Sequence, residues 1–133
     1  MSKQILIADD SSVVRHVLKM FLQDRNGIRV CGEAANGFEA VEKAKTLRPD
    51  LVLLDLSMPE MNGAEAASVL KKMMPNMPII VFTMTMFSDN LGRSLASAIG
   101  VDMVLSKPEG MRALVETIDG LLGPSQPARI IPL

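Results

Sequence analysis

The sequence predicts an α/β fold in which a five-stranded parallel sheet, in the order 2-1-3-4-5, carries helices on both faces. Short runs rich in Ile, Val and Leu alternate with longer stretches of helical period, which is typical of a parallel sheet covered on both sides. The chain has 133 residues, of which 48% are apolar, enough for one compact domain with a proper core.

Five apolar segments are the predicted strands, and each precedes a stretch of helical period. Their residues are rich in the branched side chains that favour strands, and polar or turn-forming residues bound most of them. The predicted strands are Gln4 to Ala8, Ile28 to Glu33, Leu51 to Asp55, Pro78 to Thr83 and Asp102 to Ser106.

The first and last helices are predicted to be amphipathic and to pack on the sheet. In the first helix, Arg15, His16, Lys19 and Gln23 are expected to point away from one apolar stripe, which consists of Val13, Val14, Val17, Leu18, Phe21 and Leu22. The last helix repeats the arrangement with Met111, Leu114, Val115, Ile118 and Leu122. Because Gly123-Pro124 ends that helix, we expect a domain over residues 1–123 and a C-terminal tail or the start of a linker over 124–133.

Composition argues against several classes of function. The net charge is −1, so no basic excess favours direct binding to nucleic acid or to an anionic membrane. Cys31 is the only cysteine, and it cannot form an internal disulfide. The N-terminus lacks the apolar segment of a signal peptide, and no apolar run is long enough to span a membrane. We therefore expect a cytoplasmic protein.

Polar side chains collect at the carboxyl ends of the predicted strands, where open parallel sheets bind ligands. Asp9 and Asp10 follow the first strand, and Asp55 ends the third. Thr83 ends the fourth strand, and Lys107 follows the fifth. In the order 2-1-3-4-5 the first and third strands are neighbours, so the three carboxylates should meet in one cleft.

Three carboxylates in one cleft require positive charge. Two of them about 4 Å apart repel by about 4 kcal/mol at an effective dielectric constant near 20. Lys107 supplies one charge, and Mg²⁺, which prefers oxygen ligands, is the predicted second source. Asp55 is then the expected nucleophile toward a phosphoryl group, whose oxygens Thr83 and Lys107 would hold. Asp9 and Asp10 would hold the metal directly or through water.

Each of these residues also has an ordinary structural role when it is considered by itself. Any one of the aspartates could cap the helix that follows it. Lys107 could be a solvated surface side chain, and Thr83 an unremarkable strand residue. Their joint placement at one edge of the sheet is what favours a phosphoryl site.

These residues resemble the receiver domain of bacterial two-component response regulators, including the chemotaxis regulators. The resemblance rests on the run Ile5 to Asp10, the pattern D-x-x-M-P-x-x-x-G from Asp55 to Gly63, Thr83, and Lys107-Pro108. It covers residues 3–122 and implies a flavodoxin-like, doubly wound fold. Val104 departs from the pattern, because many receivers have Tyr or Phe three residues before the lysine.

The resemblance implies a signalling domain and not a turnover enzyme. A sensor histidine kinase or a phosphotransfer protein would phosphorylate Asp55. Mg²⁺ would be bound by Asp10, Asp55 and the backbone carbonyl of Ser57, with Asp9 assisting. Lys107-Pro108 would form a cis peptide bond. An output domain or effector would bind the fourth helix, fifth strand and fifth helix, and the fourth and fifth helices could also form a homodimer.

Two other functions remain open at this point. A magnesium-dependent phosphatase could work through an aspartyl phosphate, although Ser57 stands where the second acid of a D-x-D motif belongs. The second alternative is a flavodoxin-like protein that binds a nucleotide or a flavin. Against it, the loop Asp9 to Ser12 contains no glycine of the kind that phosphate-binding loops use. The sequence also leaves open whether the chain is free-standing or a receiver from a longer regulator.

Overall fold

The computed structural model describes residues 2–25, 27–83, 89–106 and 110–123. Its sheet contains five parallel strands in the order β2-β1-β3-β4-β5, which confirms the predicted fold class and strand order. Every predicted strand is present, with its ends within one residue of the prediction. The strands are β1 (Lys3–Ala8), β2 (Ile28–Ala34), β3 (Leu51–Leu54), β4 (Ile79–Thr83) and β5 (Met103–Ser106). Lys107, the Lys107-Pro108 peptide bond and the tail over 124–133 lie outside the described residues.

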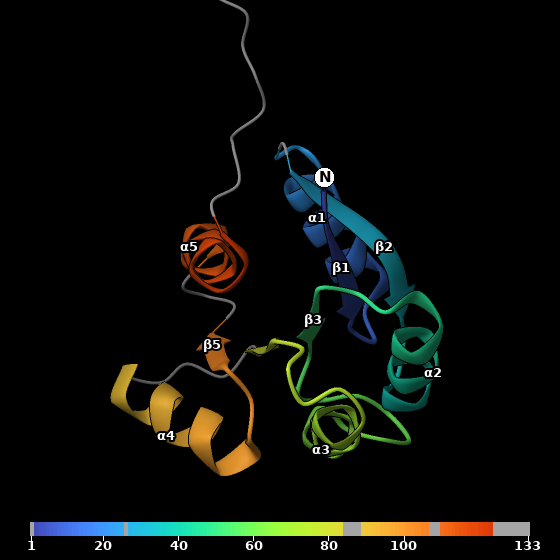
Figure 1. Ribbon diagram of the computed structural model, residues 1–133, viewed down its shortest axis with the longest axis vertical. Coiled ribbons are helices and arrows are strands. Elements are labelled where there is room, and N and C mark those ends of the chain that lie inside the picture. The colour runs from blue at the N-terminus through green and yellow to red at the C-terminus, as the bar shows by residue number, and fades with distance from the viewer. Residues whose placement is uncertain (1, 26, 84–88, 107–109, 124–133) are drawn as a thin grey trace, which may run out of the picture.

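Helices cover both faces of the sheet (Figure 1). One face packs against α1 (Ser12–Gln23) and α5 (Met111–Leu122). The other packs against α2 (Gly37–Leu47), α3 (Gly63–Met73) and α4 (Asp89–Ile99). Strand residues alternate between the two cores because successive side chains point to opposite sides of a strand. Leu53, for example, faces α1 and α5, whereas Leu54 faces α2 and α3.

The apolar stripe predicted for α1 is wrong in part. Val14, Leu18 and Leu22 pack on the sheet, but Val13 is 70% exposed and Val17 is 48% exposed. Phe21 and Met20 are also exposed. The helix is apolar over a wider arc than the sheet can cover, so the rows beside the central one remain in solvent. In α5, by contrast, the predicted stripe is confirmed, with Leu114, Val115 and Ile118 buried and Met111 and Leu122 packed against them.

Cys31 lies on β2 and behaves as a small apolar residue. Its Sγ lies 3.5 Å from the Ile5 carbonyl oxygen, and burial raises the pKa of the thiol above its usual value. The thiol therefore stays protonated at neutral pH. Across the part of the chain that the structure describes, no helix combines the length and the apolar character needed to cross a bilayer.

Candidate metal centre

The candidate site lies where β1 and β3 end side by side. Hydrogen bonding between the strands continues one residue past each of them, because the Asp9 amide donates to the Ala34 carbonyl at 3.0 Å and the Asp55 amide donates to the Ala8 carbonyl at 2.8 Å. These backbone bonds fix Asp9 and Asp55 at the same edge of the sheet, with Asp10 next in the chain.

The three predicted carboxylates do meet at this edge. Asp9, Asp10 and Asp55 each offer an oxygen atom, and these atoms lie within 4.8 Å of one another. Asp9 and Asp55 are buried, with 2% and 7% of their surfaces exposed, whereas Asp10 is exposed. Negative charges this close are stabilised by a cation, and a set of carboxylate oxygens fits a hard divalent ion. The cluster is therefore an acidic pocket that could bind a metal ion.

The turn from β1 into α1 is held together mainly by side chains. The Asp9 Oδ1 atom accepts a hydrogen bond from the Ser11 amide at 2.9 Å, and the Ser11 hydroxyl accepts from the Val14 amide at 3.2 Å, which caps α1. Arg15 Nη1 donates to the Asp9 carbonyl at 2.7 Å, while its Nε lies 3.2 Å from Glu33 Oε1.

The contact between Arg15 and the Asp9 carbonyl was not predicted from the sequence. The sequence predicts that Arg15 points away from the sheet, but only 18% of its side chain is exposed, and it reaches the backbone of the acidic turn. A signal for this was present in the sequence. Arg15 lies four residues after the capping residue Ser11, and side chains on a helix lean toward its N-terminus. A long donor at that position can therefore reach the turn that precedes the helix.

The loop from β3 into α3 is held mainly by its backbone. The Gly63 amide donates to the Leu56 carbonyl at 2.9 Å, and the Gly37 amide donates from α2 to the Met61 carbonyl at 3.0 Å. Asn62 and Glu65 form a capping box at the start of α3. At Gly63 an added Cβ would overlap the Asp55 carbonyl oxygen and lie 2.8 Å from Leu56 Cα, so this position has no room for a side chain.

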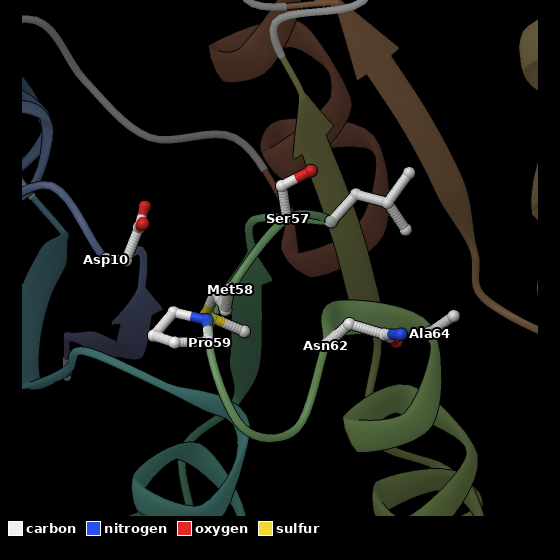
Figure 2. A pocket seen from close by; sticks show the side chains of 7 residues that line it. Asp10, Ser57, Met58, Pro59, Asn62 and Ala64 are labelled. Carbon is white, nitrogen blue, oxygen red and sulfur yellow. The ribbon is translucent and has the colours of Figure 1, made fainter.

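An open cleft of about 590 Å³ adjoins the acids (Figure 2). Asp10 stands on one side of it, and Ser57 stands opposite on the loop after β3. The other residues lining the cleft come from the same loop and from the start of α3: Leu56, Met58, Pro59, Asn62 and Ala64. Ser57, whose backbone carbonyl is a predicted metal ligand, thus lines the same open cleft as Asp10.

The other side of the same edge carries hydroxyl groups. Thr83 ends β4, is buried, and pairs in register with Ser106 of β5. Ser106 is 1% exposed, and its hydroxyl has no hydrogen-bond partner among the residues that the structure describes. Lys107 comes next in the chain, outside the described residues. Sequence reasoning identified Thr83 but not Ser106, because a serine at the end of a strand carries no pattern of its own.

Comparisons with known proteins agree with this geometry. Residues 5–119 match the model of the response regulator receiver domain family. Over 81 residues the chain is 49% identical to chemotaxis protein CheY of Thermotoga maritima, an alignment that covers 61% of this chain and 67% of that protein. Over 115 residues it is 36% identical to response regulator protein VraR of Staphylococcus saprophyticus, covering 86% of this chain. The alignment covers 54% of VraR, so the chain spans about half the length of that relative.

Solved structures give the same result. The response regulator domain of Thermotoga maritima CheB is 28% identical, with a TM-score of 0.79 over 99% of this chain and 100% of that chain. The CheX-CheY-BeF₃-Mg²⁺ complex from Borrelia burgdorferi is 25% identical, with a TM-score of 0.75 over 90% of this chain and 88% of that chain.

Proposed function

This chain belongs to the response regulator receiver domain family, in which accepting a phosphoryl group during two-component signalling is typical, and on that premise we propose that Asp55 is the phosphoacceptor. One observation carries the proposal. Asp55 directly follows β3, the strand beside β1, and its buried carboxylate meets those of Asp9 and of Asp10, which lines an open cleft. A donor is proposed to approach from the side of this cleft, which Asp10 and Leu56, the residue after Asp55, both line.

The metal of this site is proposed to be Mg²⁺, bound by Asp10, Asp55 and the backbone carbonyl of Ser57, with Asp9 assisting. The donors are all oxygen atoms, which Mg²⁺ prefers, and Asp10 and Ser57 line opposite sides of the same cleft. The ion, when bound, neutralises charge on the carboxylates and on the incoming phosphoryl oxygens. The CheX-CheY complex from Borrelia burgdorferi contains Mg²⁺ together with BeF₃.

The chemistry is nucleophilic. A carboxylate oxygen of Asp55 attacks phosphorus, a P–O bond forms, and the P–N bond of a phosphohistidine donor breaks with its electron pair left on the imidazole. The Thr83 hydroxyl and the Lys107 ammonium group are proposed to bind the oxygens of the transferred group. Thr83 stands at the same sheet edge as Asp55, and Lys107 directly follows the last residue of β5.

Response regulators interact with kinases and with output domains, and the finer assignment is proposed here. The donor is a sensor histidine kinase or a phosphotransfer protein, and an effector or output domain binds the surface formed by α4, β5 and α5. We also propose that two copies of the domain can form a homodimer through α4 and α5. A net charge of −1 supports an output that does not involve direct contact of this domain with nucleic acid. Val104 is buried on β5, so the effector surface would respond without an aromatic side chain there.

We also propose the bounds of the domain and its location in the cell. Residues 1–123 form the receiver, and residues 124–133 are a tail or the start of a linker. The domain assists its own phosphorylation and dephosphorylation but does not turn over a substrate. We place it in the cytoplasm.

The test is phosphorylation by acetyl phosphate, measured by intact mass with and without Mg²⁺. Wild type is expected to gain one phosphoryl group only with Mg²⁺, and Asp55→Asn to gain none at any Mg²⁺ concentration. Asp10→Asn is the matched control, because it also removes one carboxylate charge but keeps the acceptor. It should still be phosphorylated when Mg²⁺ is raised. A wild-type protein that gains no mass, or an Asp55→Asn variant that does, would contradict the proposal.

A further inference from the structure

We propose that Arg15 is a positioning residue for the metal centre, holding the Asp9–Asp10 turn in the shape that binds the ion. The inference rests on the proposed function, since it concerns Mg²⁺ binding at the same acids. Arg15 comes from α1, and its hydrogen bond to the turn goes to the backbone carbonyl of Asp9. It would therefore act through Asp9.

Arg15 is anchored at two points, and these lie on different elements. Its Nη1 atom donates to the Asp9 carbonyl at 2.7 Å, and its Nε atom lies 3.2 Å from Glu33 Oε1 on β2. A planar guanidinium bound at two points fixes direction as well as distance. The Asp9 carbonyl is thereby tied to β2, while the Asp9 carboxylate is held by the Ser11 amide at 2.9 Å.

The turn needs this support because of the charge that it carries. Asp9 and Asp10 place two carboxylates on adjacent residues, and the oxygens of both lie within 4.8 Å of Asp55. Their mutual repulsion favours any backbone movement that separates them. A second anchor on the Asp9 peptide opposes this movement before the ion arrives, so that less of the binding free energy is spent on ordering the turn.

The sign of the effect separates positioning from simple charge. Arg15 is a cation beside a cation site, and by charge alone it repels Mg²⁺. If charge were its only influence, Arg15→Met would bind Mg²⁺ more tightly than wild type. If Arg15 positions the turn, the same variant would bind Mg²⁺ more weakly, by about tenfold, which is the lower end of the loss seen when groups that support metal ligands are removed.

Lys19 provides the matched control. Its Nζ lies 3.6 Å from Glu33 Oε2, so Lys19→Met also removes one positive charge from α1 and one partner from Glu33. No hydrogen bond from Lys19 to the acidic turn is found in the described part of the chain. The pair of variants therefore differs in the Asp9 contact, and any difference in Mg²⁺ affinity measures that contact.

The experiment is calorimetric titration of Mg²⁺ into wild type, Arg15→Met, Arg15→Lys and Lys19→Met, with circular dichroism to check that each variant is folded. We expect the affinity of Arg15→Met to fall about tenfold, and that of Lys19→Met to stay equal or rise slightly. Arg15→Lys should fall between wild type and Arg15→Met, because a single ammonium group cannot reproduce the two-point anchor.

A kinetic readout distinguishes positioning from damage to the acceptor. In phosphorylation by acetyl phosphate, the Mg²⁺ concentration for half-maximal rate should rise in Arg15→Met, while the rate at saturating Mg²⁺ returns close to wild type. Arg15→Met binding Mg²⁺ as tightly as Lys19→Met, or more tightly, would overturn the inference. If wild type itself failed to bind Mg²⁺, the proposed function would fail instead, so the two failures can be told apart.

Discussion

The carboxyl edge of the sheet has two halves that are built differently. The acid half consists of the turn over residues 9–12 and the loop over residues 55–63, and the hydroxyl half consists of Thr83 and Ser106. In the acid half, the turn and the loop are tied to neighbouring elements by backbone amides, helix caps and Arg15. In the hydroxyl half, the Ser106 hydroxyl is buried with no partner among the described residues.

This difference follows the charge that each half carries. Three carboxylates within 4.8 Å repel one another, so a firmly held backbone beneath them helps to keep them together. A hydroxyl is neutral, and leaving one unpaired in the interior costs only about 1–3 kcal/mol. Substitutions should therefore be costly at the bracing positions of the acid half and mild, or even stabilising, in the hydroxyl half.

Gly63→Ala is the most severe test of the bracing. An added Cβ would overlap the Asp55 carbonyl oxygen and lie 2.8 Å from Leu56 Cα, and neither backbone atom can move without moving the acceptor residue. We expect the free energy of unfolding to fall by about 3 kcal/mol or more. Urea titration followed by circular dichroism measures it, because the chain has no Trp or Tyr to report by fluorescence.

Gly120→Ala is the matched control for this change. Gly120 lies within α5, and among the described residues no atom from outside its own stretch of helix lies within 4 Å of the position that its Cβ would take. The same substitution there should stabilise the protein by roughly 0.5–1 kcal/mol, since alanine favours helix. Equal changes in the free energy of unfolding at the two glycines would mean that the close contact between α3 and the Asp55 backbone does not stabilise the loop.

Gly37→Ala tests the second brace, which joins α2 to the loop of the acid half. Its Cβ would overlap the Met61 carbonyl oxygen and lie 2.7 Å from Met61 Cγ. The hydrogen bond that the Gly37 amide donates to that carbonyl would be lost or lengthened. Part of the clash is with a side chain that can turn aside, so we expect a smaller loss, about 2 kcal/mol by urea titration. A loss as large as that of Gly63→Ala would show that the two braces act as one unit.

The sequence was sufficient to predict the fold and the meeting of the acids. Both depend on strong local patterns, namely apolar strands in alternation with helices and polar residues where strands end. The order of the strands then brings Asp9 and Asp55 together, because β1 and β3 are neighbours. The roles of Ser57, Thr83 and Lys107 remain predictions.

The features that could not be predicted from the sequence depend on how a single helix is rotated about its own axis. The apolar arc of α1 is wide, and periodicity alone does not say that Leu18 is buried while Val17 is 48% exposed. The contact of Arg15 with the Asp9 carbonyl was not predicted for the same reason, because the sequence pattern points Arg15 away from the sheet. Ser106 was missed because the lack of a hydrogen-bond partner among the described residues depends on its neighbours in space and has no signature along the chain.

The smallest expected effects come from two serines and should have opposite signs. In the acid half, Ser11 caps α1 by accepting a hydrogen bond from the Val14 amide at 3.2 Å, so Ser11→Ala should lower the free energy of unfolding by about 1 kcal/mol. In the hydroxyl half, Ser106→Ala removes a buried hydroxyl that has no partner among the described residues, so it should raise the free energy of unfolding by about 1 kcal/mol.

Urea titration of both serine variants beside wild type decides the comparison. A stabilised Ser106→Ala protein would mean that the cross-strand neighbour of Thr83 is held in an unfavourable environment in this conformation. Any rearrangement of this edge that offered the hydroxyl a partner would then be favoured. Loss of stability in Ser106→Ala would mean that the hydroxyl is paired in solution, and the two halves of the edge would then be braced alike.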